Sequence, residues 1–184
     1  MRTDEIWHNK VKSKVVEKRF PPRIQNDLQR LDIPANLPEK GTSLYLFGDT
    51  DTGKTILASF MLLEYEKELY LNNLPGESLF VNTCDLFNTL KESFENKEIT
   101  EQSIIKKYQQ VPFLVLDDFG TIKPSDWVYQ TLYLIINYRY EHLLITIFTS
   151  NNDMKKTELM FGDNRITSRI ERMCQIKKKT KYKV

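Results

Sequence analysis

Short apolar runs alternate with longer stretches of helix length from residue 42 onward. The runs are nearly continuous rather than alternating in polarity, which is typical of parallel strands that are covered on both faces. Strands and helices that alternate along the chain predict a three-layer α/β domain with a parallel sheet. The expected strands are Ser43–Phe47, Ser78–Asn82, Phe113–Asp117 and Leu143–Thr149, and the expected helices are 54–72, 84–95, 101–109 and 125–141.

An amphipathic helix is expected before this domain, over residues 5–19. Trp7, Val11 and Val15 recur there at a spacing of four and define one apolar face, while lysines occupy the remainder. A proline pair ends the helix, because proline cannot donate a backbone hydrogen bond. The apolar face either contacts a partner or packs on the domain that follows, and the sequence leaves both alternatives open. We divide the chain into a basic N-terminal helical extension, 1–22, and a main domain, 23–184.

Two weaker patterns belong to the main domain. One further helical turn is expected around Ile24–Leu31, and a final helix is expected at about 163–174. The basic segment after that helix could form one more strand.

Charge is distributed unevenly along the chain. Residues 1–23 carry a net charge of +4 and residues 165–184 carry +7, whereas the segment between them carries −9. Basic ends on an acidic body favour contacts with nucleic acid or an acidic partner. Solvated termini are the alternative.

The composition is ordinary for a soluble globular protein, with 40% apolar and 28% charged residues among 184, and the length fits a single domain. Collagen-like, disulfide-scaffold and disordered classes are excluded. No apolar run is long enough to cross a bilayer and no signal-peptide pattern begins the chain, so we expect a cytoplasmic protein with no membrane contact. Cys84 and Cys174 stand far apart, which makes a disulfide framework or a cysteine zinc site an unfavourable interpretation.

The segment after the first expected strand has the pattern GxxxxGK[ST] of a phosphate-binding loop and leads into a helix. Its glycines let successive N–H groups face one phosphate chain, and the helix start directs its positive dipole end at the same anion. Lys54 would reach the β- and γ-phosphates of ATP, and the Thr55 hydroxyl would ligate Mg²⁺. Asp49 and Asp51 add negative charge; either their side chains point away, with Asp tolerating left-handed backbone, or they weaken affinity. The loop consists of Gly48, Asp49, Thr50, Asp51, Thr52, Gly53, Lys54 and Thr55.

Two carboxylates end the third apolar strand, in the manner of a Walker B element. Asp117 would hold Mg²⁺, directly or through water, and Asp118 is placed to polarise the attacking water. Asn151 follows the next strand, where it would either orient that water or serve as a turn residue. Arg165 and Arg169 lie four residues apart on one helical face, where they could reach a γ-phosphate on a neighbouring subunit or stay solvated.

These motifs carry a resemblance to a known family. GDTDTGKT, FLVLDDFG, FTSNN and GDNRITSRI, within residues 42–175, are similar to the AAA+ ATPase domain of DnaC/DnaI-type helicase loaders, with the IstB transposition ATPases as close relatives. The resemblance implies a P-loop NTPase with an ASCE-type sheet, in which the Walker B strand lies between the P-loop strand and another. It also implies self-association through ATP-bridged interfaces, with Asn151 as sensor 1 and Arg169, or alternatively Arg165, as an arginine finger acting on the neighbouring subunit.

The chain departs from that family in two places. Loaders usually carry an N-terminal helicase-binding domain, whereas only about forty residues precede the first strand here. Lys183 would have to replace the arginine that the family tends to place as sensor 2.

Single-stranded DNA is the second ligand that the resemblance implies. Phe94 and Trp127 fall in segments that face the central channel of related rings, where aromatic side chains can stack on bases. Core packing is the alternative for both, because aromatic residues on helices usually face inward.

The leading interpretation is an ATP-dependent loader that assembles on single-stranded DNA and delivers or remodels a replicative helicase. An IstB-like regulator of transposition, with a transposase as partner, is the runner-up. A nucleotide or small-molecule kinase is a third alternative, against which the paired aspartates and the distal arginines argue. A fourth is a module that binds nucleotide only to assemble, for which Asp51 is the sole indication.

Overall fold

The computed structural model describes residues 3–31, 33–39, 41–95 and 98–180. The strands in this part of the chain are β1 (Ser43–Phe47), β2 (Ser78–Asn82), β3 (Phe113–Asp117), β4 (Ile145–Ser150) and β5 (Cys174–Lys178). The helices are α1 (Thr3–Ile6), the π-helix η1 (Trp7–Val11), α2 (Lys12–Arg19), α3 (Pro22–Arg30), α4 (Lys54–Leu71), α5 (Thr83–Glu92), α6 (Glu101–Gln110), α7 (Asp126–Glu141), α8 (Met154–Phe161) and α9 (Arg165–Met173).

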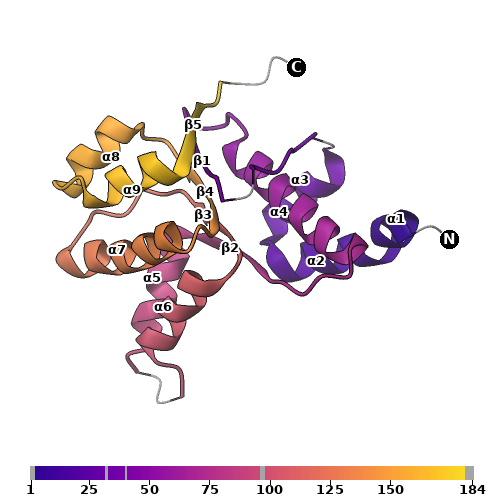
Figure 1. Cartoon of the computed structure of the whole chain (residues 1–184), viewed down its shortest axis with the longest axis horizontal. Coiled ribbons are helices and arrows are strands. Elements are labelled where there is room, and N and C mark those ends of the chain that lie inside the picture. The colour runs from indigo at the N-terminus through magenta and orange to yellow at the C-terminus, as the bar shows by residue number, and fades with distance from the viewer. Residues whose placement is uncertain (1–2, 32, 40, 96–97, 181–184) are drawn as a thin grey trace.

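The strands form one parallel sheet in the order β2-β3-β4-β1-β5, with helices on both faces (Figure 1). Helices α2, α3 and α4 cover one face, and α5, α6, α7 and α9 cover the other. Strand side chains alternate between the two cores: Leu44 and Leu46 pack towards α4, whereas Tyr45 and Phe148 pack towards α7 and α9. The three-layer α/β fold predicted from the sequence is therefore confirmed.

The first three predicted strands have the predicted bounds, and the basic segment after α9 does form a strand, which pairs with β1. The fourth strand begins at Ile145 rather than Leu143, because Leu143 has a positive φ of 52° and belongs to the turn after α7. Strand β3 lies between β1 and β2 in the sheet order, but β4 is inserted between β3 and β1. Helix α8 was not predicted at all.

The N-terminal segment packs on the main domain through its apolar face. Trp7 is 2% exposed, with its ring centre 5.6 Å from that of Tyr70 on α4. The π-helix adds a residue to one turn and shifts the helical face, so Val16 is buried where the sequence predicted Val15. Of the two alternatives for this face, the structure shows the packing one, whereas the division after residue 22 stays a prediction. No helix of the described residues is long and apolar enough to cross a membrane.

Candidate functional site

The loop between β1 and α4 has the backbone of a phosphate-binding loop. Three of its residues have positive φ: Gly48 (148°), Asp51 (60°) and Gly53 (79°). Such angles are costly for most residues and cheap for glycine, and aspartate tolerates them better than most. Gly53 is also the N-cap of α4, so the free N–H groups of the first helical turn lie at the end of the loop. The expectation that an aspartate here takes a left-handed conformation is confirmed at Asp51.

Lys54 is folded into this loop. Its Nζ donates to the carbonyl oxygens of Gly48 (2.9 Å) and Asp49 (2.8 Å), and the side chain is buried. Burial lowers the pKa of Lys54, and the carboxylates of Asp118 and Asp117 oppose that shift. The cation is thus held at the loop by neutral acceptors and by nearby negative charge, which an anion bound in the loop would supplement.

Asp117 at the end of β3 links the loop to the Walker B strand. Its Oδ1 accepts hydrogen bonds from the hydroxyls of Thr55 (2.7 Å) and Thr149 (2.6 Å). Burial raises the pKa of Asp117, and the two hydroxyl hydrogen bonds oppose the shift. A threonine hydroxyl and a buried carboxylate side by side are oxygen ligands of the kind that Mg²⁺ prefers, so these residues fit the metal.

Asp118 follows in a left-handed conformation, with a φ of 53°. Its N–H donates to the Thr149 hydroxyl (3.0 Å), and its carboxylate accepts from the side-chain amide of Asn82 (3.1 Å) at the end of β2. Asn82 is itself fixed, because its Oδ1 caps α5 by accepting from the N–H of Cys84 (2.9 Å). The backbone turn therefore separates two adjacent carboxylates, one held by hydroxyls and the other by an amide.

A cleft of about 750 Å³ opens along this edge of the sheet. Asp117, Asp118 and Asn151 line it together with most of the P-loop, whereas exposed Asp49 lies outside its lining. The neighbouring Asn152 turns away, and its amide donates to the carbonyl oxygen of Gly120 (3.3 Å). Of the two asparagines after β4, the structure thus brings the predicted one, Asn151, to the cleft.

Sequence reasoning missed several residues at this site. Asn82 and Thr149 stand at the carboxyl ends of parallel strands, the edge at which open α/β sheets bind ligands, so their positions were a usable signal. Asp85 from α5 and Arg23 and Asp27 from α3 also line the cleft. No motif in the sequence marks these three residues.

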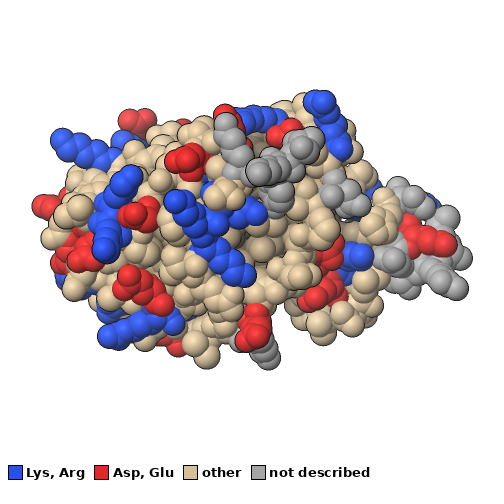
Figure 2. Space-filling model, turned by 90° about the horizontal axis from the view of Figure 1, so that it is seen from above, with Lys and Arg blue, Asp and Glu red and all other residues tan. Residues whose placement is uncertain are grey.

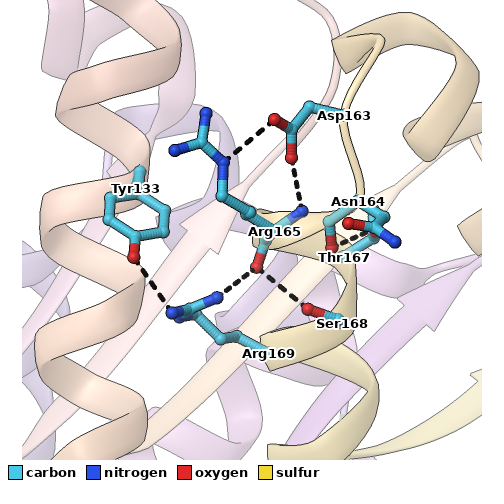
Figure 3. Close-up of polar contacts among 7 residues, drawn as sticks. All are labelled: Tyr133, Asp163, Asn164, Arg165, Thr167, Ser168 and Arg169. Atoms are coloured by element: carbon cyan, nitrogen blue, oxygen red, sulfur yellow. Dashed lines mark hydrogen bonds and ion pairs between the residues drawn. The ribbon is translucent and has the colours of Figure 1, made fainter.

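The structure does not bring Arg165 and Arg169 to this cleft, whose lining includes neither of them. Both lie on α9 against α7, where Figure 3 shows Arg169 beside Tyr133 and Arg165 beside Asp163. An arginine placed there can act on a nucleotide only if that nucleotide belongs to another molecule.

The two aromatic candidates differ in exposure. Phe94 is 60% exposed and packs edge-on against Trp127, with ring centres 5.7 Å apart. Trp127 is partly buried against Phe87, and its indole N–H donates to Glu101 (2.6 Å). Of the pair, only Phe94 presents most of its surface to solvent. Lys183, the sensor-2 candidate, lies outside the described residues.

The fold and this cleft together define a P-loop NTPase of the AAA+ type. Residues 17–178 match the family model described as IstB-like ATP binding protein, and the chain belongs to that family.

Relatives and solved structures agree with this assignment. The chain is 27% identical over 113 residues to the replicative helicase loader DnaI of Bacillus subtilis, covering 61% of this chain and 34% of the relative. It is 29% identical over 128 residues to a putative insertion sequence ATP-binding protein of Sinorhizobium fredii, covering 70% and 40%. A crystal structure of the DnaC helicase loader matches with a TM-score of 0.63 at 26% identity, covering 90% of this chain and 96% of that one. The chain spans only 34% to 40% of the length of these two curated relatives.

Proposed function

We propose that the protein is an ATP hydrolase that acts as a helicase loader, assembling with further copies on single-stranded DNA. The observation that carries the proposal is the hydrogen bond between Thr55 and Asp117, because it joins the P-loop to the Walker B strand at the place where a nucleotide-bound Mg²⁺ is held in P-loop NTPases. Membership of the ATP-binding family supports the nucleotide assignment.

The residues of the cleft have separate roles in the binding and hydrolysis of ATP. The P-loop N–H groups and the start of α4 bind the phosphates, and Lys54 exchanges its loop carbonyl partners for the β- and γ-phosphate oxygens. Thr55 and Asp117 would hold Mg²⁺, and the metal would neutralise charge on the phosphates. Asp118 accepts the proton of the attacking water, and Asn151 orients that water from the end of β4, the strand beside β3.

Asn82 donates a hydrogen bond to the Asp118 carboxylate. This hydrogen bond fixes the orientation of the carboxylate group at the end of β3. A carboxylate has several acceptor positions on its two oxygens, so Asp118 can accept from Asn82 and contact a water molecule at the same time. Asn82 therefore sets the position from which the base acts.

The proposed partners follow from the relatives. DnaI and DnaC are named as helicase loaders, so we propose a replicative helicase as the partner of this chain. For single-stranded DNA, exposed Phe94 offers a stacking surface, and Lys177 and Lys178 on β5 are exposed. Figure 2 shows a group of basic side chains near the middle of one face of the molecule, with acidic side chains scattered around it.

A second function deserves a test because of one relative. The insertion sequence ATP-binding protein shares 29% identity with this chain, which favours a transposase as the alternative partner. Capture of the purified replicative helicase of the source cell, but not of a transposase, supports the loader function. The reverse result replaces it with regulation of transposition.

The hydrolase assignment is tested with three variants. Lys54→Ala should abolish ATP binding, because the loop loses its cation and the hydrogen bonds of that cation to phosphate. Asp118→Asn should bind Mg²⁺–ATP as the parent does and hydrolyse it at least about a hundredfold more slowly, since general bases contribute about 10² to 10⁴. Exposed Lys155→Ala is the matched control and should behave as the parent. Normal turnover by Asp118→Asn would remove that residue from the base role.

A further inference from the structure

A groove of about 690 Å³ lies at the edge of the sheet opposite the nucleotide cleft. It is bordered by α4, by the loop before β1 and by the segments that lead into β3 and β4, and we call it the amino-edge groove. Helix α4 reaches both sites, because Lys54 lines the cleft and Glu68 lines the groove. Since a helix rises about 1.5 Å per residue, these two residues lie about 20 Å apart along α4. A ligand in the groove would therefore not compete with a nucleotide.

Apolar side chains from several segments line the amino-edge groove, and some of them are open to water. Leu143, from the turn after α7, is 69% exposed, and Pro112, directly before β3, is exposed as well. Leu37 and Pro38 add two half-buried side chains from the loop before β1. Exposed apolar residues are ordinary when they are scattered singly, whereas a patch that several segments build around one hollow is typical of a contact site.

The wall that α4 contributes to this groove is rigid. The ring of Tyr65 lines the groove and stacks on the ring of Phe113, with the ring centres 4.7 Å apart. Phe113 is the first residue of β3 and is fully buried. Because the sheet holds Tyr65 in place, a partner that binds here would lose little free energy in ordering the wall.

Two carboxylates stand on the α4 side of the groove. Glu64 and Glu68 lie one helical turn apart and belong to the lining, to which no Lys or Arg of the described residues contributes. Across the part of the chain that the structure describes, neither side chain forms an ion pair or a hydrogen bond. Glu66, between them in sequence, differs, because it pairs with Arg19 (3.0 Å) and accepts from the Ser78 hydroxyl. The groove thus combines an apolar surface with negative charge.

We propose that the amino-edge groove binds a basic segment of a partner protein. The apolar side chains of that segment pack on Leu143 and Pro112, and its Lys or Arg side chains lie beside Glu64 and Glu68. Charge complementarity selects this occupant, because the two carboxylates attract cations and repel the phosphates of nucleic acid and of anionic lipids. The apolar surface supplies most of the affinity, since exposed ion pairs contribute little. The proposal goes beyond the proposed hydrolysis, which uses the other edge of the sheet.

The first test selects peptides from a random library displayed on phage, with the full chain as the target. Leu143→Asn combined with Glu64→Gln and Glu68→Gln serves for counter-selection, so that peptides bound elsewhere are removed. Peptides that bind the parent but not this triple variant should be enriched in Lys and Arg together with Leu, Ile or Phe, relative to the unselected library. If no such peptides are recovered, or if they lack the excess of Lys and Arg, the proposal is wrong.

A synthetic copy of the most enriched peptide, titrated by fluorescence anisotropy, tests the apolar contact. Leu143→Asn should bind it about tenfold more weakly, because one apolar side chain is lost. The same variant should keep or raise the parental melting temperature, since Leu143 has a φ of 52° and asparagine tolerates that backbone better than leucine. Leu159→Asn, at an 81% exposed position of α8, is the control and should leave the peptide affinity unchanged. Parental affinity in Leu143→Asn would contradict the assignment of the site.

Glu64→Gln combined with Glu68→Gln tests the charges. This double variant should bind the peptide about threefold to tenfold more weakly at low salt, and it should lose most of the salt dependence that the parent shows. A merely structural role of the two glutamates would leave that salt dependence unchanged. Glu158→Gln, at an exposed position outside the groove, is the control and should keep both the affinity and its salt dependence.

Other outcomes indicate a different occupant and overturn the proposal. Salt dependence that persists in the double glutamine variant would mean that other charges hold the peptide. Spermidine that binds as tightly as the peptide would make the groove a site for small cations. Self-association of the parent that Leu143→Asn abolishes would make a second copy the occupant. Affinity for ATP should be parental in every groove variant, so a failure of the proposed hydrolysis would leave the proposal for the groove intact.

Discussion

Gly48 lies where two segments distant in sequence come into contact. A Cβ atom at this position would lie 2.2 Å from the carbonyl oxygen of Lys179. The approach is that close because the N–H of Lys179 donates to the carbonyl oxygen of Phe47 (2.7 Å) directly beside the P-loop. A glycine is therefore needed at this position for two reasons: the backbone at Lys179 of the same chain leaves no room for a Cβ atom, and the phosphate-binding loop needs a positive φ here.

Gly48→Ala should accordingly destabilise the protein by about 2–4 kcal/mol, from backbone strain at positive φ and from overlap with a backbone atom. It should also weaken ATP binding, because the loop must move away from β5. Chemical denaturation and nucleotide titration measure the two effects. Gly162→Ala is the control: its φ is also positive, at 67°, but nothing lies within 4 Å of the added Cβ. We expect it to lose only about 1 kcal/mol, and equal losses would contradict the steric argument.

The sequence was sufficient for some residues of the site and insufficient for others. Lys54 and Asp117 could be predicted because each belongs to a motif whose chemistry fixes the residue type. The contact of Asn82 with Asp118 could not, since it joins the ends of two strands whose order in the sheet the sequence does not state. The different constraints on Arg165 and Arg169 were equally invisible, because they depend on α7.

At the scale of the elements, a buried arginine ties three segments together. Arg139 of α7 is fully buried and donates to the carbonyl oxygens of Tyr108, Val111 and Ile145 and to the Thr146 hydroxyl, over 2.6–2.9 Å. Burial lowers the pKa of Arg139 to about 9, which still leaves it a cation at neutral pH. The guanidinium thus supplies hydrogen-bond donors to backbone carbonyl groups at the end of α6, in the segment before β3 and at the start of β4.

Arg139→Lys should cost at least about 3 kcal/mol, although it preserves the charge, because an ammonium group cannot span acceptors on three segments and leaves some of them unpaired. Thermal and chemical denaturation measure the loss. Arg172→Lys, at an exposed position of α9, should cost almost nothing. A similar small effect at Arg139 would mean that the fold does not depend on the fork geometry.

The N-terminal helix gives a second test at this scale. Trp7→Ala should destabilise the protein by about 3 kcal/mol, because the indole is buried against Tyr70. Its effect on ATP hydrolysis at a temperature where the variant is folded should be small. Val11→Ala is the milder comparison, since Val11 is only partly buried. If Trp7→Ala keeps parental stability and loses a partner contact instead, the packing of Trp7 on Tyr70 does not contribute to the free energy of unfolding.

The bounds of the buried strands could be predicted from the sequence, whereas helices that depend on capping residues or on a local change of helix type were not predicted. The central strands are continuous apolar runs, so their bounds followed directly from the pattern. Helix α8 has no such pattern, although Asp153 caps its start and Gly162 ends it, and these two signals were available. The π-helix could not be predicted, because the apolar spacing of the N-terminal segment fits an unbroken α-helix equally well.

At the scale of the whole molecule, the lining of the nucleotide cleft carries more acidic than basic side chains. Five aspartates line the cleft against the two cations Lys54 and Arg23, namely Asp27, Asp51, Asp85, Asp117 and Asp118. A nucleoside triphosphate that binds without a metal places its phosphates near more negative than positive charge. The affinity for ATP should therefore depend on a divalent cation more strongly than the P-loop motif alone would indicate.

Removal of Mg²⁺ with EDTA should lower the affinity for ATP at least about tenfold, because the aspartates then repel the uncompensated phosphates. Isothermal titration with and without EDTA measures the difference. Asp51→Gly should reduce this difference in ATP affinity, whereas Asp49→Asn, at a position outside the lining of the cleft, should leave it unchanged. A metal-independent affinity would argue that these carboxylates are screened.

The pairing of β5 with β1 bears on how the chain is made. Leu44 pairs with Ile147 on one side and with Gln175 on the other, so β1 is synthesised more than a hundred residues before either of its neighbours in the sheet. Contacts of such long sequence separation form slowly, because the intervening loop must close first. The P-loop reaches its final shape only when the strand beside Gly48 has docked, so a nascent chain acquires the capacity to bind nucleotide at the end of folding rather than at its start.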